Sequence, residues 1–559
     1  MHVAKQLRLW EPPMDLADRI PNPGGDYGEV FTRRWIVEMI LDLVGYVPER
    51  DLASCVLVEP SCGTGAFLVP IVERLIDSAR AHGQELDSLA PAIRAFDLLD
   101  ANADRARKAV TNCLVDAGLP HVRAEAMAEA WISTEDFLLH DHAASDVDFV
   151  VGNPPYIRLE NVPRNVMDAY RRQCPTMRGR ADIYVGFIER GLDLLCPGGT
   201  LGFICADRWM HNQYGSQLRD LVSRSYAVET VITMHDVDAF EADVSAYPAV
   251  IVLRNGEQSD ANVVDTTASF GPASATRVAE WANGRKRRAA TGRGFEGSRL
   301  EGWFSGDELW PTGSPTRLAI IKDLESRFPL LEDPGTKTRV GIGVATGCDE
   351  VYITDDANIV EEDRLLPLLQ ASDITSGAAD WSGSFLINPW DRSGLVDLER
   401  HPRLGDYLRQ RLRGRHVARR RPTQWYRTID RVDPDLQARP KLVIPDLKAA
   451  AHPVLDEGIC YPHHNLYYVV SDRWDLEVLG GLLLSDVTNL FVGSYCVKMR
   501  GGCYRFQAQY LRRLRVPVCS SVRPADRRAL ARAFRMRDVE AATATAAHLY
   551  GLERLPRIR

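Results

Sequence analysis

The 559-residue chain lacks the cysteine spacing of a zinc ribbon or of a disulfide-stapled domain. Its 11 cysteines are scattered and form no CxxC pair. The sequence therefore predicts neither kind of site, no bound metal, and a reducing cytoplasm as the location.

Long apolar runs are also missing. The run VLGGLLL (478–484) stops at Ser485 and Asp486, which is too short to cross a bilayer. Residues 1–20 carry acids and prolines without the apolar core of a signal peptide, so we expect an N-terminal arm and no membrane partner.

An excess of positive charge is absent as well. The net charge of −8 argues weakly against nucleic acid as a partner, since such proteins usually carry a basic face. Two runs depart from this total: RLRGRHVARRR (411–421) and NGRKRR (283–288). A solvated face is the simpler interpretation of either run alone, but basic patches also occur on acidic proteins.

What the first half does contain is a regular alternation of strand-like and helix-like segments. Helical spacing follows each of several apolar runs, namely 54–59, 92–97, 147–152 and 200–206. This predicts a doubly wound, mostly parallel α/β sheet, Rossmann-like, over residues 21–255. The composition of 256–310 predicts an irregular linker, and 311–559 predicts a second domain of mixed α+β structure. In such sheets ligands bind at the carboxyl ends of the strands.

The first strand ends at Glu59 and enters a glycine-rich turn, EPSCGTG (59–65). Glycines allow the backbone to approach a ligand closely. The pattern alone is weak, because many turns between strand and helix are rich in glycine. Leu68 replaces the third glycine of a dinucleotide fingerprint and no Walker lysine follows, so a phosphate-cradling loop is disfavoured.

Acidic residues follow the next two strands. Asp97 is placed to bind the hydroxyls of a ribose, although capping of the next helix is an equally good interpretation. Asp136 and Phe137 can take an adenine amino group and cover its ring, whereas an ordinary loop is the simpler interpretation of that pair alone.

The buried strand 147–152 ends in Asn153-Pro154-Pro155-Tyr156. Proline has no N–H, so the turn is stiff and its carbonyls are left out of regular pairing. The Asn153 side chain and the Pro154 carbonyl can together accept both hydrogens of an exocyclic amino group, and Tyr156 offers a flat face to a base. A proline turn with a packed tyrosine is the plain alternative. Four such features at the ends of four successive strands would share one edge of the sheet, so we expect one site.

These motifs resemble the class I S-adenosylmethionine-dependent DNA methyltransferases of the adenine-N6 type, in the TaqI-like gamma group. The resemblance is strong over residues 24–255 and weaker in the C-terminal half. Beyond EPSCGTG, Asp97 and NPPY it rests on GEVFTRRWIVEMIL (28–41), ADIYVGFIERGLDLLCPGGTLGFICADRW (181–209), DAFEADVSAYPAVIVL (238–253), GIGVATGCDEVYI (341–353), LLPLLQASDI (365–374) and YRFQAQYLRRLRVPV (504–518).

The resemblance implies methyl transfer from S-adenosylmethionine to N6 of an adenine flipped out of double-stranded DNA. It implies catalytic roles for Asn153, Pro154, Tyr156 and Phe240, of which Phe240 stacks on the extruded base. Tyr247 is the rival for that stacking role, because VSAYPAV carries extra residues before the last strand. The implied cofactor-binding residues are Thr32, Glu59, Pro60, Ser61, Cys62, Gly63, Asp97, Asp136, Phe137 and Pro155.

The second domain is predicted to recognise the DNA target. Two runs that mix arginines with aromatic residues, 413–427 and 494–506, suit phosphate contacts and base readout. A solvated helix end is the alternative for the triple arginine. The candidate DNA-binding residues are Arg419, Arg420, Arg421, Trp425, Tyr426, Arg500 and Arg505.

Other functions stay open from the residues alone. A protein glutamine-N5 methyltransferase or an RNA adenine methyltransferase would use the same turn on another planar amino group. A non-catalytic DNA-binding subunit would keep the fold without intact motifs. A fused nuclease would need its own module, and PDLKAA (445–450) is better explained as a strand and turn. The sequence thus predicts a monomeric, stand-alone methylase, with a separate cognate restriction endonuclease inferred from the family alone.

Overall fold

The computed structural model describes residues 30–142, 146–241, 247–284, 286–412, 424–496 and 503–556. The chain divides into two compact units, Met1–Leu318 and Ala319–Arg559, and each is described by itself. The predicted N-terminal arm, residues 1–20, lies outside the described residues.

The first unit is built on a ten-stranded sheet with the order β3-β2-β1-β4-β5-β7-β6-β8-β10-β9. The strands β3, β2, β1, β4 and β5 run parallel, whereas β7 is antiparallel to both β5 and β6. The predicted doubly wound α/β fold is thus confirmed. The strands are β1 (Leu57–Glu59), β2 (Ile93–Asp97), β3 (Ile132–Thr134), β4 (Val147–Gly152), β5 (Leu195–Ala206), β6 (Ala227–Thr233), β7 (Pro248–Arg254), β8 (Ala261–Thr266), β9 (Ala289–Gly292) and β10 (Phe295–Leu300).

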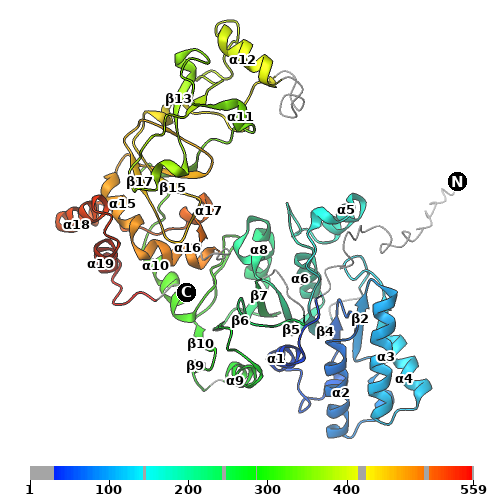
Figure 1. Ribbon diagram of the computed structural model, residues 1–559. Helices are drawn as coiled ribbons and strands as arrows, with labels where there is room; N and C mark the ends of the chain where they lie inside the picture. The colour runs from blue at the N-terminus through cyan, green and yellow to red at the C-terminus, as the bar shows by residue number, and fades with distance from the viewer. Residues whose placement is uncertain are drawn as a thin grey trace, which may run out of the picture. The chain divides into compact units, whose positions relative to one another are not determined.

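Helices cover both faces of this sheet. One core packs α1, α2, α3 and α9 against it, and a second core packs α5, α6 and α8 against the opposite face, as Figure 1 shows. Because both faces are covered, the central strand β4 is almost entirely apolar. The helices are α1 (Arg34–Val44), α2 (Leu68–His82), α3 (Asp100–Asp116), α4 (His121–Trp131), α5 (Arg164–Gln173), α6 (Tyr184–Asp193), α7 (Arg208–His211), α8 (Ser216–Ser225) and α9 (Pro272–Asn283).

The prediction of an irregular linker over 256–310 was wrong. These residues form β8, α9, β9 and β10, and β8 pairs with β6 so that the sheet continues through them. The composition misled because β9 is the edge strand of the sheet and alternates exposed with half-buried residues, so it need not be apolar.

The second unit is α+β. It contains two four-stranded sheets, β11-β19-β15-β17 and β12-β14-β13-β18, and the pair β16-β20. Its strands are β11 (Arg339–Ile342), β12 (Ile353–Thr354), β13 (Leu365–Leu369), β14 (Phe385–Ile387), β15 (Lys441–Pro445), β16 (Leu447–Lys448), β17 (Val454–Asp456), β18 (Tyr461–Pro462), β19 (Leu466–Val470) and β20 (Tyr504–Arg505).

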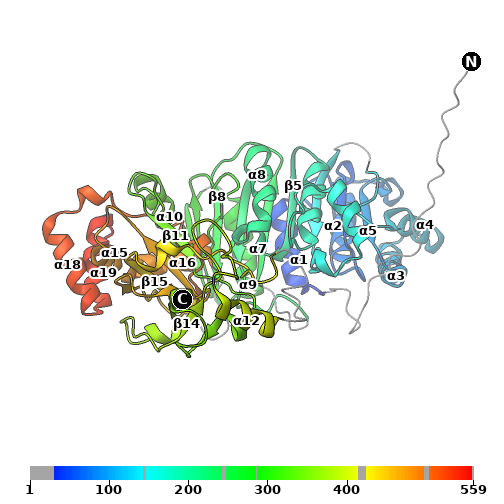
Figure 2. The ribbon, with the colours of Figure 1, turned by 90° about the horizontal axis from the view of Figure 1, so that it is seen from above.

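The helices of this unit gather mainly at its C-terminal end. Figures 1 and 2 both show α15, α18 and α19 side by side, and these helices contact one another. The helices are α10 (Pro315–Arg327), which begins in the first unit, α11 (Asp349–Tyr352), α12 (Pro402–Leu412), α14 (Pro434–Gln437), α15 (Leu476–Leu484), α16 (Asp486–Tyr495), α17 (Ala508–Leu511), α18 (Pro524–Arg535) and α19 (Val539–Tyr550).

Within the described residues, no single helix has the length and apolar character to span a membrane. The consecutive helices α15 and α16, bent by 62° at their junction, meet that test only as a pair, on length and composition.

Candidate active site

The turn after β1 carries the glycine-rich segment. Gly63 and Gly65 have φ of 53° and 99°, a backbone conformation that side chains other than glycine's rarely adopt. The Cys62 N–H donates to the Phe96 carbonyl at 2.8 Å, which fixes the turn against the end of β2. The turn thereby opens a cavity at the carboxyl ends of the parallel strands.

Asp97, the last residue of β2, holds this turn as well as lining the cavity. One carboxylate oxygen accepts the Gly63 N–H at 2.8 Å, and the other accepts the Leu99 N–H at 2.9 Å. Glu59 is 1% exposed, and its Oε2 has no hydrogen-bond partner among the described residues. Burial, and then the charge of Asp97, raises the pKa of Glu59 well above its usual range. Glu59 therefore leaves an unpartnered carboxyl oxygen at the cavity wall.

Asp136 follows β3 and is held from two sides. Its Oδ2 accepts the Tyr170 hydroxyl at 2.8 Å, and its Oδ1 accepts the Leu138 N–H at 2.9 Å. Burial raises the pKa of Asp136. Beside it, the Phe137 ring stacks on Phe187, with centroids 5.5 Å apart and planes at 20°. The pair gives the cavity a flat apolar wall.

Asn153 stands at the end of β4 with its amide in a fixed orientation. Its Nδ2 donates to the Val30 carbonyl at 2.8 Å and to Thr32 Oγ1 at 3.1 Å. Its Oδ1 is buried and has no hydrogen-bond partner among the described residues. Both amide hydrogens are thus committed, and the oxygen remains as an acceptor at the cavity wall. The Ser61 hydroxyl donates to the Asn153 carbonyl at 3.1 Å, which ties the first and fourth motifs together.

The structure brings the sequence-predicted residues into one cavity. All of the predicted cofactor-binding residues line it, together with Asn153 and Pro154. Several residues that line the cavity were missed in the sequence analysis. None holds a distinctive motif position, and only the folding of the chain places them at the cavity wall. These are Leu99 and Asn102 after β2, Ile157 and Val162 after the turn, Tyr170 on α5, and Ile183 and Phe187 at α6.

Tyr156 and Phe240 lie beside this cavity and do not line it. Phe240 is brought there by an isolated antiparallel bridge to Thr32, and its ring meets Tyr156 edge-on at 6.3 Å and 75°. Phe240 is 5% exposed. The rival aromatic, Tyr247, instead contacts His235, with ring centroids 5.0 Å apart.

A buried acid holds the segment that carries Phe240. Asp207 follows β5 and is 0% exposed, and its Oδ2 lies 2.7 Å from His235 Nε2 and 3.4 Å from His211 Nε2. Its backbone N–H donates to the Tyr247 carbonyl at 3.2 Å. His235 precedes Phe240 and Tyr247 follows it, so Asp207 contacts the described chain both before and after Phe240. We call Asp207, His235 and Tyr247 the Asp207 clamp.

Comparison with known proteins assigns the chain to a family. The sequence profile of the family described as Eco57I restriction-modification methylase matches residues 86–240. The chain is 45% identical to the type II methyltransferase M.PaeR7I of Pseudomonas aeruginosa over 551 residues, which cover 97% of this chain and 95% of the relative.

The chain belongs to the type II restriction-modification methyltransferases. A second relative, M.XhoI of Xanthomonas vasicola, is 42% identical over 543 residues, covering 95% of this methyltransferase and 98% of the relative. The predicted family is thus confirmed, and the protein is a DNA methyltransferase.

A solved structure supports the fold of the methyltransferase. The type IIL restriction-modification enzyme MmeI, in complex with DNA, aligns with a TM-score of 0.54 at 12% identity, covering 94% of this chain and 74% of that one. At this identity the likeness concerns the fold alone.

The predicted DNA-binding residues of the methyltransferase fall into two groups. Arg419, Arg420, Arg421 and Arg500 lie outside the described residues. Trp425 and Tyr426 pack on the core of the second unit, and the Tyr426 hydroxyl donates to the Val396 carbonyl at 2.8 Å.

Arg505 is also engaged within its own unit. It pairs with Asp446 at 2.5 Å, and its side chain is 42% exposed. Tyr426 therefore has a structural role in the second unit, whereas the Arg505 side chain is paired and still partly exposed to solvent.

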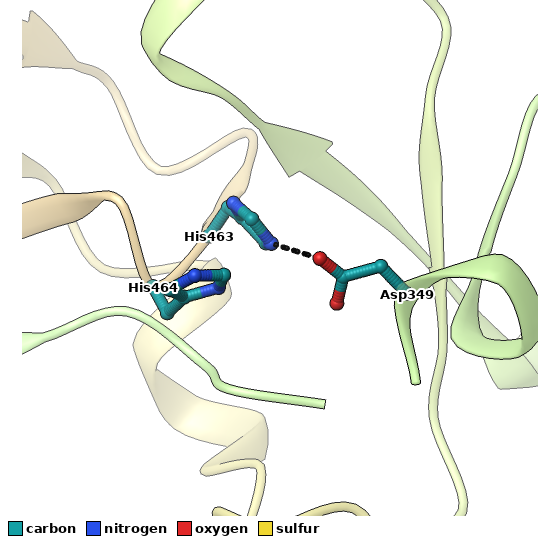
Figure 3. Close-up of side chains that lie close together, drawn as sticks. All are labelled: Asp349, His463 and His464. Carbon is teal, nitrogen blue, oxygen red and sulfur yellow. Dashed lines mark ion pairs between the residues drawn. The ribbon is translucent and has the colours of Figure 1, made fainter. Parts of the chain in front are cut away.

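One cluster in the second unit has the side chains of a metal site. Asp349, His463 and His464 converge from two segments, as Figure 3 shows, and one possible ligand atom of each lies within 4.8 Å of the others. Burial lowers the pKa of His463, so its ring is neutral near pH 7.

Proposed function

We propose that this methyltransferase transfers a methyl group from S-adenosylmethionine to N6 of an adenine that is flipped out of duplex DNA. The observation that carries the proposal is the Asn153 amide. Its two hydrogens are bound by Val30 and Thr32, so only its buried Oδ1 is left to bind a ligand, and it can do so only as an acceptor. An acceptor in that place suits a substrate that presents N–H groups, such as an exocyclic amino group.

The cavity residues fit S-adenosylmethionine by their chemistry. The apolar wall of Phe137, Phe187 and Ile183 suits an adenine ring, and the Asp97 carboxylate suits ribose hydroxyls. The partnerless Oε2 of Glu59 supports a polar ligand group at this wall, because buried polar atoms are normally hydrogen-bonded. When bound, the cofactor would supply a methyl group already activated on a sulfonium.

The difficulty of the reaction lies in the nucleophile, since the lone pair of the adenine amino nitrogen is delocalised into the ring. Asn153 Oδ1 and the Pro154 carbonyl would accept its two N–H groups and favour a pyramidal nitrogen. Asn153 and Pro154 would hold the nitrogen while it accepts the methyl group that the cofactor would supply, and the surplus proton of the nitrogen would leave to water. Catalysis by these residues is orientation and fixed electrostatics.

Tyr156 and Phe240 would hold the flipped base. Unstacking a base costs a few kcal/mol, and stacking on an aromatic side chain returns about 1–3 kcal/mol for each base. The Tyr156 hydroxyl lies 3.4 Å from the Ile204 carbonyl, and burial raises the pKa of Tyr156, so it stays a neutral phenol.

The second unit would select the target sequence, with a separate restriction endonuclease as the partner of the system. The named relatives are type II methyltransferases, and we propose a cytoplasmic location because the DNA of the cell would be the substrate. We propose a monomer, because one chain carries both the methyl-transfer residues and a unit large enough to recognise DNA.

Two measurements test this proposal. The full chain, incubated with duplex DNA and labelled cofactor, should yield N6-methyladenine after the DNA is hydrolysed to nucleosides and analysed by mass spectrometry. Label on cytosine instead would refute the adenine assignment. Asn153→Ala should lose at least about 100-fold in turnover, the usual effect of deleting one fixed hydrogen-bonding group at a reacting centre.

A measurement of cofactor binding distinguishes a role of Asn153 in methyl transfer from a role in binding the cofactor. Asn153→Ala should bind S-adenosylmethionine within about twofold of wild type by calorimetry, because its effect is on the nucleophile. Asn358→Ala, at an exposed asparagine of the second unit, is the matched control and should keep full turnover. Near-normal turnover by Asn153→Ala would overturn the mechanism.

A further inference from the structure

Three side chains of the second unit converge in one cluster. Asp349 is the first residue of α11, and His463 and His464 follow β18 at the turn into β19. Figure 3 shows the two imidazoles facing the Asp349 carboxylate. The backbone holds these segments together, because Val344 bridges His463 and its carbonyl accepts the His464 N–H at 3.1 Å.

His463 is the informative member of this cluster. It is 6% exposed, and its polar neighbours are Asp349 and Asn465, although neither ring nitrogen meets the geometry of a well-formed hydrogen bond among the described residues. Buried imidazole nitrogens normally make well-formed hydrogen bonds, so the loose contacts of this ring leave it able to bind an added ligand. Its Nε2 lies 3.3 Å from Asp349 Oδ2, the atom toward which it points.

The distance between His463 Nε2 and Asp349 Oδ2 also fits two ligands of one metal ion. Two ligands bound to one tetrahedral ion, each at about 2.0–2.1 Å, lie roughly 3.3 Å apart. We propose that Asp349, His463 and His464 bind one divalent transition-metal ion of the zinc class. Two imidazole nitrogens and one carboxylate oxygen favour zinc over magnesium or calcium, which prefer oxygen ligands throughout.

The surroundings fit this role. Thr346, which is 1% exposed, donates its hydroxyl to Asp349 Oδ1 and so turns Oδ2 toward His463. Orientation of a ligand by a hydrogen bond from behind is typical of metal sites. His464 is exposed, so its ring can rotate to bring one nitrogen, the third ligand atom of the site, toward the ion.

The ion would brace the segment next to the predicted DNA-binding run. The Ile429 N–H donates to the Thr346 carbonyl at 3.1 Å, and the Asp430 N–H donates to the Ala345 carbonyl at 3.0 Å. Residues 424–430, which include Trp425 and Tyr426, are therefore tied to the loop that leads into Asp349. The role inferred for the ion is structural, and it lies outside the methyl-transfer chemistry.

The test uses the full-length chain without an affinity tag, stripped with a chelator and then dialysed against zinc chloride. Zinc measured by mass spectrometry should reach one equivalent per chain. Asp349→Asn and His464→Ala, both at exposed positions, should weaken zinc binding at least tenfold in competition with a chromophoric chelator. His121→Ala, at a histidine whose side chain is 70% exposed, is the matched control and should bind as wild type does.

Two outcomes overturn the site: no zinc on the wild-type chain, or equal zinc on the wild type and both variants. Cobalt substitution gives an independent readout, because the visible spectrum of a bound tetrahedral cobalt should appear in the wild type and disappear in His464→Ala. Hydrogen exchange tests the brace. Exchange at the Ile429 and Asp430 amides should slow several-fold with zinc, and unchanged exchange with zinc bound would refute the bracing role.

Discussion

Asp207→Asn tests how the methyltransferase holds the aromatic residue proposed to receive the base. Asp207 contacts the described chain both before and after Phe240, through its carboxylate to His235 and its backbone N–H to the Tyr247 carbonyl. Asparagine keeps the shape and the backbone bond but removes the charge. The variant therefore isolates the carboxylate's share in positioning Phe240.

The size of the effect follows from the burial of this pair. Asp207 is 0% exposed, and a hydrogen bond to a charged group contributes about 1.5–3 kcal/mol. If that energy is lost from the arrangement that binds the flipped base, turnover falls by roughly 10- to 150-fold. Cofactor affinity should stay constant, because neither Asp207 nor His235 lines the cavity.

The charge state of the clamp adds a pH signature. Burial acts to lower the pKa of His235, but the Asp207 charge and hydrogen bond outweigh burial and raise it. The stabilisation is therefore fully present below the ordinary histidine value of about 6.5 and is lost as pH rises through the raised pKa. His211 faces the same carboxylate, and Asp236 and Asp265 reinforce the raised pKa of His235.

The assay is single-turnover methylation of a duplex with saturating cofactor, followed from pH 6 upward. In the wild type the methylation rate should fall as pH rises through the raised pKa of His235. In Asp207→Asn this fall in rate should occur at lower pH. A duplex with 2-aminopurine at the target adenine should show less fluorescence gain with the variant, because fewer bases are flipped. His235→Gln should behave similarly.

Asp238→Asn is the control within the same segment. Asp238 pairs with Arg33 at 2.7 Å, but its side chain is 79% exposed, and exposed pairs contribute only about 0–1 kcal/mol. Turnover should change less than about fivefold. A folded Asp207→Asn enzyme with wild-type turnover, or one whose whole defect is in cofactor affinity, would refute the positioning role.

Three other changes probe the cavity and the second unit. Asp97→Asn should raise the Kd for S-adenosylmethionine about tenfold or more by calorimetry, since a charge-assisted acceptor is removed, and an unchanged Kd would contradict its cofactor role. Tyr170→Phe removes the 2.8 Å donor to Asp136 and should raise the same Kd by a few-fold, about 1 kcal/mol; an effect on turnover alone would argue against it. Lys441→Met leaves the buried Asp456 without its 2.5 Å partner and should lower the free energy of unfolding by about 3–5 kcal/mol in a denaturant titration of the full chain. An unshifted transition would show that the backbone bonds to Asp456 are sufficient.

Local motifs explain why so much of the candidate cavity could be predicted from the sequence. Glu59, Asp97 and Asn153 each end a parallel strand, and parallel strands present their carboxyl ends at one edge. The position of each of these residues at the end of a strand is therefore enough to predict that they lie close together. No such local signal pairs Asp136 with Tyr170 or Asp207 with His235, because α5 and β6 reach those acids only through tertiary packing.

The second unit was less predictable for the same reason. Its sheets pair strands that are far apart in the sequence, such as β11 with β19 and β13 with β18. No periodic pattern of apolar residues predicts those pairings. The cluster of Asp349, His463 and His464 arises from one of these crossings. The absence of cysteine spacing could exclude a zinc ribbon, but it could not exclude ligands brought together by the fold.

Thr32 connects the two halves of the proposed chemistry. Its hydroxyl accepts an amide hydrogen of Asn153 at 3.1 Å, and its backbone pairs with Phe240 in an isolated bridge. One residue thus orients both the acceptor proposed for the amino group and the aromatic ring proposed for the base. The rings of Tyr156 and Phe240 now meet at 75°, so a base cannot stack between them in parallel until one ring turns. Backbone hydrogen bonds from Arg33 to Ala239 and from Glu241 to Phe31 hold the chain on either side of Phe240. The adjustment would therefore come from the side chains, and the acceptor geometry at Asn153 would be kept while a base enters.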